Sequence, residues 1–250
     1  MTSGAKPNEA LPALVMLHGF ALDARMWRRQ VEAFSSAYRV LTVDLPGFGP
    51  QGRELGQVDP AADVLRALDA TKIDRVHVVA NSFGAAVASD LALRHPGRVR
   101  SLTFVGPLLL GRRTGIEAWS RCVALAAEGD KATAAEIWLD DPLFEHLRHD
   151  EELFEELRGI VLDYGGGHWT GRVSSHWSDP DPVPRLRKLD IPALVVSGEK
   201  DIPSFIQMAE AYARTLPRAR REVIAGAGHL ANVERPAEFN ALLQEFWSSL

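Results

Sequence analysis

Ser82 stands at a point in the chain where a serine could act as a nucleophile. It follows an apolar segment, residues 75–80 (RVHVVA), and precedes a helical segment of small residues, 85–94. A serine hydroxyl is a weak nucleophile that needs a base and an exposed position, which a sharp turn from strand to helix supplies. The N–H groups at the start of that helix would face developing negative charge. Taken alone, the pattern is equally compatible with an ordinary N-cap serine.

The segments around Ser82 alternate between strands and helices. Continuous apolar runs are typical of strands in a parallel sheet that is covered on both faces, and they occur at residues 13–18, 39–44, 75–80, 99–105, 191–197 and 221–225. Helical spacing occurs at residues 25–37, 59–70, 85–94, 204–215 and 236–247. Asp59 before Pro60 predicts a capped helix start. This alternation predicts an α/β fold.

Residues 107–189 interrupt the alternation. They show several helical patterns, no clear strand, and a final part rich in Pro, Gly and Asp. We therefore expect residues 1–106 and 190–250 to form an α/β core and residues 107–189 to form a mostly helical insertion. Before the first strand there is only a short polar tail, residues 1–12.

At these positions the chain resembles the α/β-hydrolase superfamily. Residues 80–84 (ANSFG) are similar to its G-x-S-x-G nucleophile elbow, with Ala80 in place of the first glycine. Residues 44–49 (DLPGFG), 197–201 (SGEKD) and 226–229 (GAGH) resemble its D-x-P-G-x-G turn, acid loop and histidine loop. The resemblance implies a mostly parallel sheet of about six to eight strands with helices on both faces. Six would remain if the antiparallel strands usual at the start are missing.

The resemblance also implies catalytic roles. Ser82 would attack a carbonyl carbon, His229 would accept and return the proton, and Asp201 would orient the imidazole. Residues 18–20 (HGF) match the family's oxyanion loop, so the backbone N–H groups of Phe20 and Phe83 would form the oxyanion hole. Glu199 is a rival acid two residues before Asp201, and Asp201 could instead cap the next helix.

In this family an insertion at residues 107–189 forms a lid over the substrate pocket. Trp138 and Trp169 could supply an apolar roof, and His168 or Arg172 could meet a polar or acidic substrate group. Packing of each aromatic residue onto the core is an equally good interpretation.

Two other histidines have structural interpretations. His18 is expected to hold the oxyanion loop through hydrogen bonds, and His77 to be a packed strand residue. His146 and His149 lie three residues apart, but no further ligands are nearby, so a solvated helix face is favoured over a metal site. No strand is followed by G-x-G-x-x-G. We therefore expect no metal and no cofactor.

Composition narrows the classes of partner. The chain has 250 residues, 28 Lys plus Arg against 33 Asp plus Glu, and a formal charge of −5. Without a basic stripe it is a poor nucleic-acid binder, and no apolar run reaches the roughly 18 residues of a membrane helix. Cys122 is the single cysteine, which excludes an intrachain disulfide. With no apolar signal core in residues 1–10, a cytoplasmic protein acting on a small molecule is expected. The oligomeric state stays open.

Two segments of the chain resemble one particular branch of the family, and the branches of this family catalyse different reactions. Residues 18–27 and 229–236 resemble the 3-oxoadipate enol-lactonase and small carboxylesterase branch. Carbon–carbon hydrolases of meta-cleavage products often have Trp after the catalytic histidine, where this chain has Leu230. The first hypothesis is therefore a serine esterase or lactonase. The alternatives are hydrolysis of a diketone carbon–carbon bond and a non-catalytic ligand-binding homologue.

Overall fold

The computed structural model describes residues 11–50, 52 and 56–250, so most of the expected polar tail lies outside the described residues. Its main sheet has six parallel strands in the order β2-β1-β4-β5-β7-β8. The strands are β1 (Ala13–Leu17), β2 (Arg39–Val43), β4 (Val76–Asn81), β5 (Val99–Val105), β7 (Ala193–Gly198) and β8 (Ala219–Ile224). This confirms the expected parallel α/β sheet, at the lower strand number.

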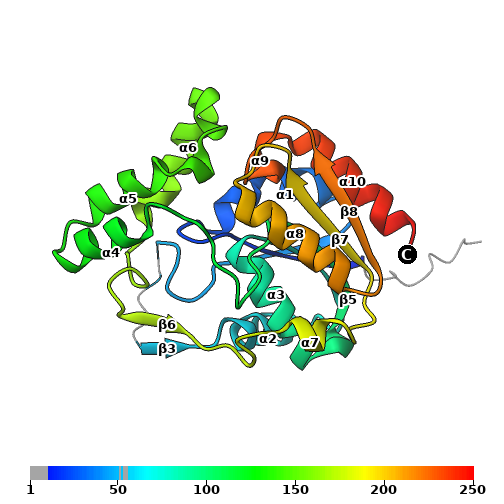
Figure 1. Ribbon diagram of the computed structural model, residues 1–250. Helices are drawn as coiled ribbons and strands as arrows, with labels where there is room; N and C mark the ends of the chain where they lie inside the picture. The colour runs from blue at the N-terminus through cyan, green and yellow to red at the C-terminus, as the bar shows by residue number, and fades with distance from the viewer. Residues whose placement is uncertain (1–10, 51, 53–55) are drawn as a thin grey trace, which may run out of the picture.

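Burial explains why these segments lack polar alternation. Every residue of the inner strands β1, β4 and β7 is buried, whereas the edge strands β2 and β8 are mostly half-buried. In Figure 1, α8 (Pro203–Thr215) lies in front of β7 and β8, and α10 (Pro236–Ser248) lies behind them. Strands covered on both faces need apolar side chains on both faces.

The other core helices follow their expected positions with shifted ends. The expected helix at residues 25–37 is a 3₁₀ turn, Ala24–Trp27, followed by a shorter α1 (Arg28–Phe34). The helix α2 (Pro60–Ala70) begins as predicted, because the Asp59 carboxylate accepts the Ala62 N–H at 3.0 Å. The remaining core helices are α3 (Phe83–Arg94) and α9 (Ala231–Glu234).

The helices of the segment 107–189 flank short turns and one short strand along the chain. They are α4 (Trp119–Ala127), α5 (Lys131–Leu139), α6 (Glu151–Asp163) and α7 (Val183–Leu186), with 3₁₀ turns at Pro142–Phe144 and Leu147–His149. Figure 1 shows α4, α5 and α6 to one side of the core, away from α10.

The expectation of no strand in this segment is wrong. The strand β6 (Val173–Ser175) pairs in parallel with β3 (Gly56–Val58), forming a separate two-stranded sheet. Both strands are too short to show an alternating pattern. Their pairing joins segments that are far apart in the chain, so local sequence does not reveal it.

No helix among the described residues is both long enough and apolar enough to span a membrane. Within the same residues, no group of three metal-ligating side chains comes together. The rings of His146 and His149 contact each other edge to face, with centroids 5.5 Å apart.

His77 is the packed strand residue that the sequence predicts. It is buried on β4, and its Nδ1 lies 2.7 Å from the Ser101 hydroxyl. Burial, reinforced by the positive charges of Arg100 and Arg75, lowers the pKa of His77 from 6.5 to about 4. The imidazole is therefore neutral in the folded protein at pH 6.

This shift predicts a loss of stability in acid. Between pH 6.5 and 4 the unfolded chain binds a proton at His77 that the folded chain does not, so the free energy of unfolding decreases as pH falls through this window. Between pH 7 and pH 4.5 we expect a decrease of roughly 2–3 kcal/mol from this group, at about 1.4 kcal/mol per pH unit below its unfolded pKa of 6.5. Urea unfolding of wild type and His77→Gln at pH 7 and pH 4.5 measures it. Equal pH dependence in the two proteins would refute the assignment.

Candidate active site

Ser82 occupies a strained turn between β4 and α3. Its backbone has φ 48° and ψ −111°, a conformation that a residue with a side chain rarely adopts. Three hydrogen bonds hold it there: its N–H donates to Val105 O, and its carbonyl accepts from the N–H groups of Ala85 and Leu108. Strain of this kind persists only where the surrounding structure over-determines it, and it concentrates at functional sites.

Small neighbours make the turn possible. A methyl group at Gly84 would lie 2.4 Å from the carbonyl oxygen of Leu17 on β1, so any larger residue would push α3 away from the sheet. Ala80, which replaces the family's first glycine, is fully buried within β4. The family's motif therefore tolerates alanine at this position but needs glycine at position 84.

His229 and Asp201 come from the loops after β8 and β7 and meet in the protein interior. The imidazole Nδ1 is 3.0 Å from one carboxylate oxygen of Asp201 and 3.1 Å from the other. Both side chains are buried. The rival Glu199 instead accepts the Gly226 N–H at 2.9 Å and is half exposed. The structure therefore brings Asp201, and not Glu199, to the imidazole.

Two glycines let these loops approach each other. A methyl group at Gly198 would lie 2.1 Å from the carbonyl oxygen of Gly228. Gly106, with φ 52°, leaves room for the imidazole, since a methyl group there would be 3.0 Å from His229 Nδ1. On its other side the imidazole contacts the Phe205 ring, with centroids 4.4 Å apart. The ring is thus held in one orientation.

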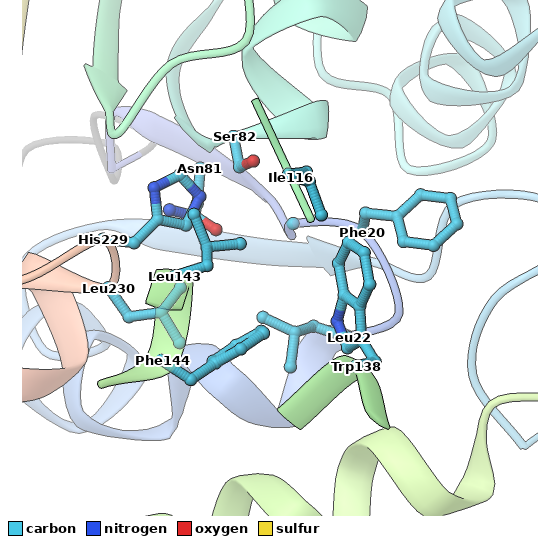
Figure 2. Close-up of a pocket in the computed structure, with 11 residues that line it drawn as sticks. Phe20, Leu22, Asn81, Ser82, Ile116, Trp138, Leu143, Phe144, His229 and Leu230 are labelled. Atoms are coloured by element: carbon cyan, nitrogen blue, oxygen red, sulfur yellow. The ribbon is translucent and has the colours of Figure 1, made fainter. Parts of the chain in front are cut away.

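Ser82 and His229 line the same small cavity, of about 20 Å³ (Figure 2). The second imidazole nitrogen, Nε2, is buried there and has no hydrogen-bond partner among the described residues. The cavity is lined by Gly19, Phe20, Leu22, Asn81, Ser82, Ile116, Trp138, Leu143, Phe144, His229 and Leu230. An unprotonated imidazole nitrogen in this position can accept a proton from a hydroxyl group.

A larger pocket of about 390 Å³ also reaches Ser82. It is lined by Phe20, Ser82, Phe83, Leu108, Leu110, Thr114, Ile116, Trp119, Trp138, His168, Val173, Ser175, Trp177 and Phe205. Ser82, Phe20, Ile116 and Trp138 belong to both linings, so the two spaces meet at the serine. A substrate in the larger pocket can therefore reach Ser82 next to the small cavity.

The loop after β1 is held in the way that the sequence predicts. His18 Nδ1 lies 2.8 Å from the Gly19 carbonyl, and His18 Nε2 accepts the Leu45 N–H at 2.9 Å. Burial lowers the pKa of His18, so the ring is neutral and its proton is on Nδ1. The loop presents Phe20 to both cavities, and Phe83 begins α3, where the first N–H groups have no partner within the helix.

The four substrate-binding candidates of the insertion separate into two groups. Trp138 lines both cavities and His168 lines the larger one. The His168 ring stacks on Phe48 at 4.4 Å, and its Nδ1 is 3.1 Å from the Tyr164 hydroxyl. The structure does not bring the other two to the pocket.

Trp169 is buried against Trp138 and Tyr164, with ring centroids 5.9 and 4.9 Å away. Arg172 is exposed and donates to Thr170 Oγ1 at 3.1 Å. Sequence reasoning missed Asn81, Ile116 and Phe205 as lining residues. For Ile116 and Phe205 the reason is that an apolar residue that lines a pocket has the same local pattern as one that packs in the core. Asn81 is polar and directly precedes Ser82 at the end of β4, a signal that could have indicated it.

Comparison with known proteins places the chain in a family. The sequence model of the alpha/beta hydrolase fold family matches residues 12–236. A 2-hydroxy-6-oxononadienedioate/2-hydroxy-6-oxononatrienedioate hydrolase of Burkholderia vietnamiensis is 33% identical over 94% of this chain and 86% of that protein. The 3-oxoadipate enol-lactonase 1 of Acinetobacter baylyi is 26% identical over 97% of this chain and 91% of that protein.

Another relative is longer than the region of similarity. The dihydrolipoyllysine-residue acetyltransferase component of the acetoin cleaving system of Cupriavidus necator is 30% identical over 96% of this chain, and the chain spans 65% of that protein's length. Among solved structures, a thermophilic esterase from Thermogutta terrifontis matches with a TM-score of 0.78 and 25% identity, over 96% of this chain and 91% of that one.

These findings confirm the resemblance to enol-lactonases and esterases. The family match includes all six strands of the main sheet and the segment 107–189. This protein belongs to the α/β-hydrolase family.

Proposed function

We propose that this protein is a serine hydrolase that cleaves a small, uncharged carboxylic ester or lactone through an acyl-enzyme. The observation that carries the proposal is the convergence of Ser82 and His229 on one buried cavity, with Asp201 behind the imidazole. A strained serine, a base and an orienting carboxylate are the groups that acyl transfer needs.

The first half of the reaction forms the acyl-enzyme. Ser82 Oγ attacks the carbonyl carbon while His229 Nε2 accepts the hydroxyl proton, and the imidazolium then gives that proton to the leaving oxygen. Asp201 accepts the Nδ1–H, which keeps Nε2 free to act as the base and stabilises the imidazolium. The N–H groups of Phe20 and Phe83 stabilise the oxyanion. Water then hydrolyses the acyl group by the same steps in reverse.

The pocket lining supports an uncharged substrate. Among the described residues that line either cavity, none is Lys, Arg, Asp or Glu, and six are Phe or Trp in the larger pocket. A carboxylate placed there would lose its hydration without a Lys or Arg partner in either lining. Trp138 and Ile116 belong to residues 107–189, which supports a lid role for this segment.

We expect kcat/KM to be at least roughly tenfold lower for the p-nitrophenyl hemiester of a short dicarboxylic acid than for the neutral ester of equal chain length, because the carboxylate is desolvated without a partner. Steady-state hydrolysis of the matched pair measures the ratio. Equal rates, or faster hydrolysis of the hemiester, would show that a cationic group reaches the substrate.

Carbon–carbon bond hydrolysis is the second candidate, favoured by the 33% identity to the Burkholderia vietnamiensis enzyme. The name of that enzyme specifies a dicarboxylate substrate, and the lining described above lacks Lys and Arg. A panel of neutral esters, lactones and a coloured dienol diketone decides between the reactions. Turnover of esters or lactones supports the proposal. Bleaching of the dienol alone would replace it with carbon–carbon cleavage, and tight retention without turnover would indicate a ligand-binding homologue.

A further inference from the structure

Two residues that line the small cavity beside the catalytic serine each have a buried polar atom with no hydrogen-bond partner among the described residues. These atoms are His229 Nε2 and Asn81 Oδ1. Figure 2 shows Asn81 and His229 grouped near Ser82, with Trp138 at the opposite end of the lining. A buried polar atom without a hydrogen-bond partner lowers the stability of the fold, so two of them at one cavity indicate a ligand or water that binds there.

The fold fixes the orientation of the Asn81 amide. Its Nδ2 donates to the Val105 carbonyl at 3.0 Å, which assigns the nitrogen to the β5 side and turns the oxygen toward Gly19. A methyl group at Gly19 would lie 2.4 Å from Asn81 Oδ1, so glycine is needed there to make room for this oxygen. Asn81 Oδ1 is therefore a hydrogen-bond acceptor with a fixed position. Asn81 takes no part in the acyl-transfer steps above.

We propose that Asn81 positions the water molecule that hydrolyses the acyl-enzyme on Ser82, an inference that rests on the proposed function. The cavity, of about 20 Å³, is large enough for one water molecule. Such a water donates one hydrogen to His229 Nε2 and the other to Asn81 Oδ1. Its remaining lone pairs are then free to face the acyl carbon on Ser82.

Hydrolysis of the acyl-enzyme then takes two steps. The water oxygen forms a bond to the acyl carbon while its proton passes to His229 Nε2, giving a tetrahedral intermediate. The bond from carbon to Ser82 Oγ then breaks, and the imidazolium returns the proton to that oxygen. The products are the carboxylic acid and free Ser82. Asn81 keeps its hydrogen bond to the second water proton throughout, so it is a positioning residue.

The rest of the lining explains why one acceptor matters. Leu22, Leu143, Phe144 and Leu230 contribute apolar walls. A water molecule in such a space has few alternative orientations that satisfy its hydrogens, so removing Asn81 Oδ1 leaves one of them without a partner. Methanol has a single hydroxyl hydrogen and needs only His229, so acyl transfer to methanol does not depend on Asn81.

The different dependence of water and methanol on Asn81 can be measured. Stopped-flow hydrolysis of p-nitrophenyl acetate separates acylation, seen as a burst, from deacylation, seen as the steady state. In Asn81→Leu we expect the burst rate to stay within about twofold and the steady-state rate to fall about tenfold, the effect of one lost hydrogen bond. With added methanol, the ratio of methyl acetate to acetic acid should rise about tenfold. Acetylated Ser82 should accumulate in intact-mass spectra.

Two further variants guard against a folding effect. Asn81→Ser shortens the side chain instead of adding apolar atoms and should show the same shift in the product ratio. Thr103→Val is the matched control. Thr103 Oγ1 is also buried and has no hydrogen-bond partner among the residues that the structure describes, but it lies in the core on β5, outside both cavity linings. It should leave both rates and the ratio unchanged.

The outcomes separate the two proposals. If the Asn81 variants lower transfer to water and to methanol equally, or leave deacylation unchanged, Asn81 does not position the water, although the acyl-enzyme stands. If wild type shows no burst and no acetylated Ser82, the proposed function fails, and this inference fails with it.

Discussion

Ser82→Ala is expected to lower kcat/KM for p-nitrophenyl esters by roughly 10⁴–10⁶-fold, the range for loss of a catalytic serine. In the proposed mechanism the oxygen of this hydroxyl group is the atom that bonds to the acyl group. Alanine, like serine, has a Cβ atom, so a φ of 48° strains the turn in both proteins. The melting temperature should therefore stay close to that of wild type, while burst and steady-state phases both disappear.

Ser89→Ala is the matched control for this result. Ser89 lies two turns further along α3 and is buried like Ser82, but its hydroxyl bonds to Ala85 O and Tyr212 OH. Its replacement should cost about 1 kcal/mol of stability and leave turnover intact. Activity in Ser82→Ala close to that of wild type would mean that another nucleophile is used, and the acyl-enzyme mechanism would have to be abandoned.

Asp201→Asn should lower kcat by about 10⁴-fold, the effect expected when the orienting carboxylate of such a triad becomes an amide. In the proposed mechanism this carboxylate, 3.0 Å from His229 Nδ1, accepts a hydrogen bond from the Nδ1–H, so that Nε2 can act as the base. An amide nitrogen at this position favours the opposite tautomer, with the proton on Nε2, and the imidazole can then no longer accept the serine proton. Steady-state kinetics with the same ester measures the loss.

Glu199→Gln tests the competing assignment two residues earlier in the chain. The glutamine oxygen can still accept the Gly226 N–H that Glu199 accepts, so the loop should keep its shape. We expect activity within about twofold of wild type and only a small change in stability, since exposed charges contribute little. A loss comparable to that of Asp201→Asn would move the acid role to Glu199.

Much of this architecture follows from local sequence. The apolar runs determine the six strands, because a strand buried on both faces cannot tolerate polar alternation. The small residues around Ser82 determine the tight turn, because Gly84 packs against Leu17 O. The serine, acid and histidine loops each follow a strand. Because parallel strands end at the same edge of the sheet, the three loops lie at that edge.

Tertiary structure decided the rest. Asp201 and Glu199 occupy the same loop, and only the packing of the β7 and β8 loops brings Asp201 alone to His229. Likewise, Trp138 reaches the pocket and Trp169 packs behind it, although both are aromatic residues of one helical segment.

Tertiary structure also decided the pairing of β3 with β6 and the presence of Asn81 and His229 in one cavity lining. Periodicity and turn chemistry act between residues a few positions apart, so they specify helices, strands and turns. Which side chains share a cavity depends on how those elements pack across the whole chain. No single segment of the sequence therefore predicts that arrangement.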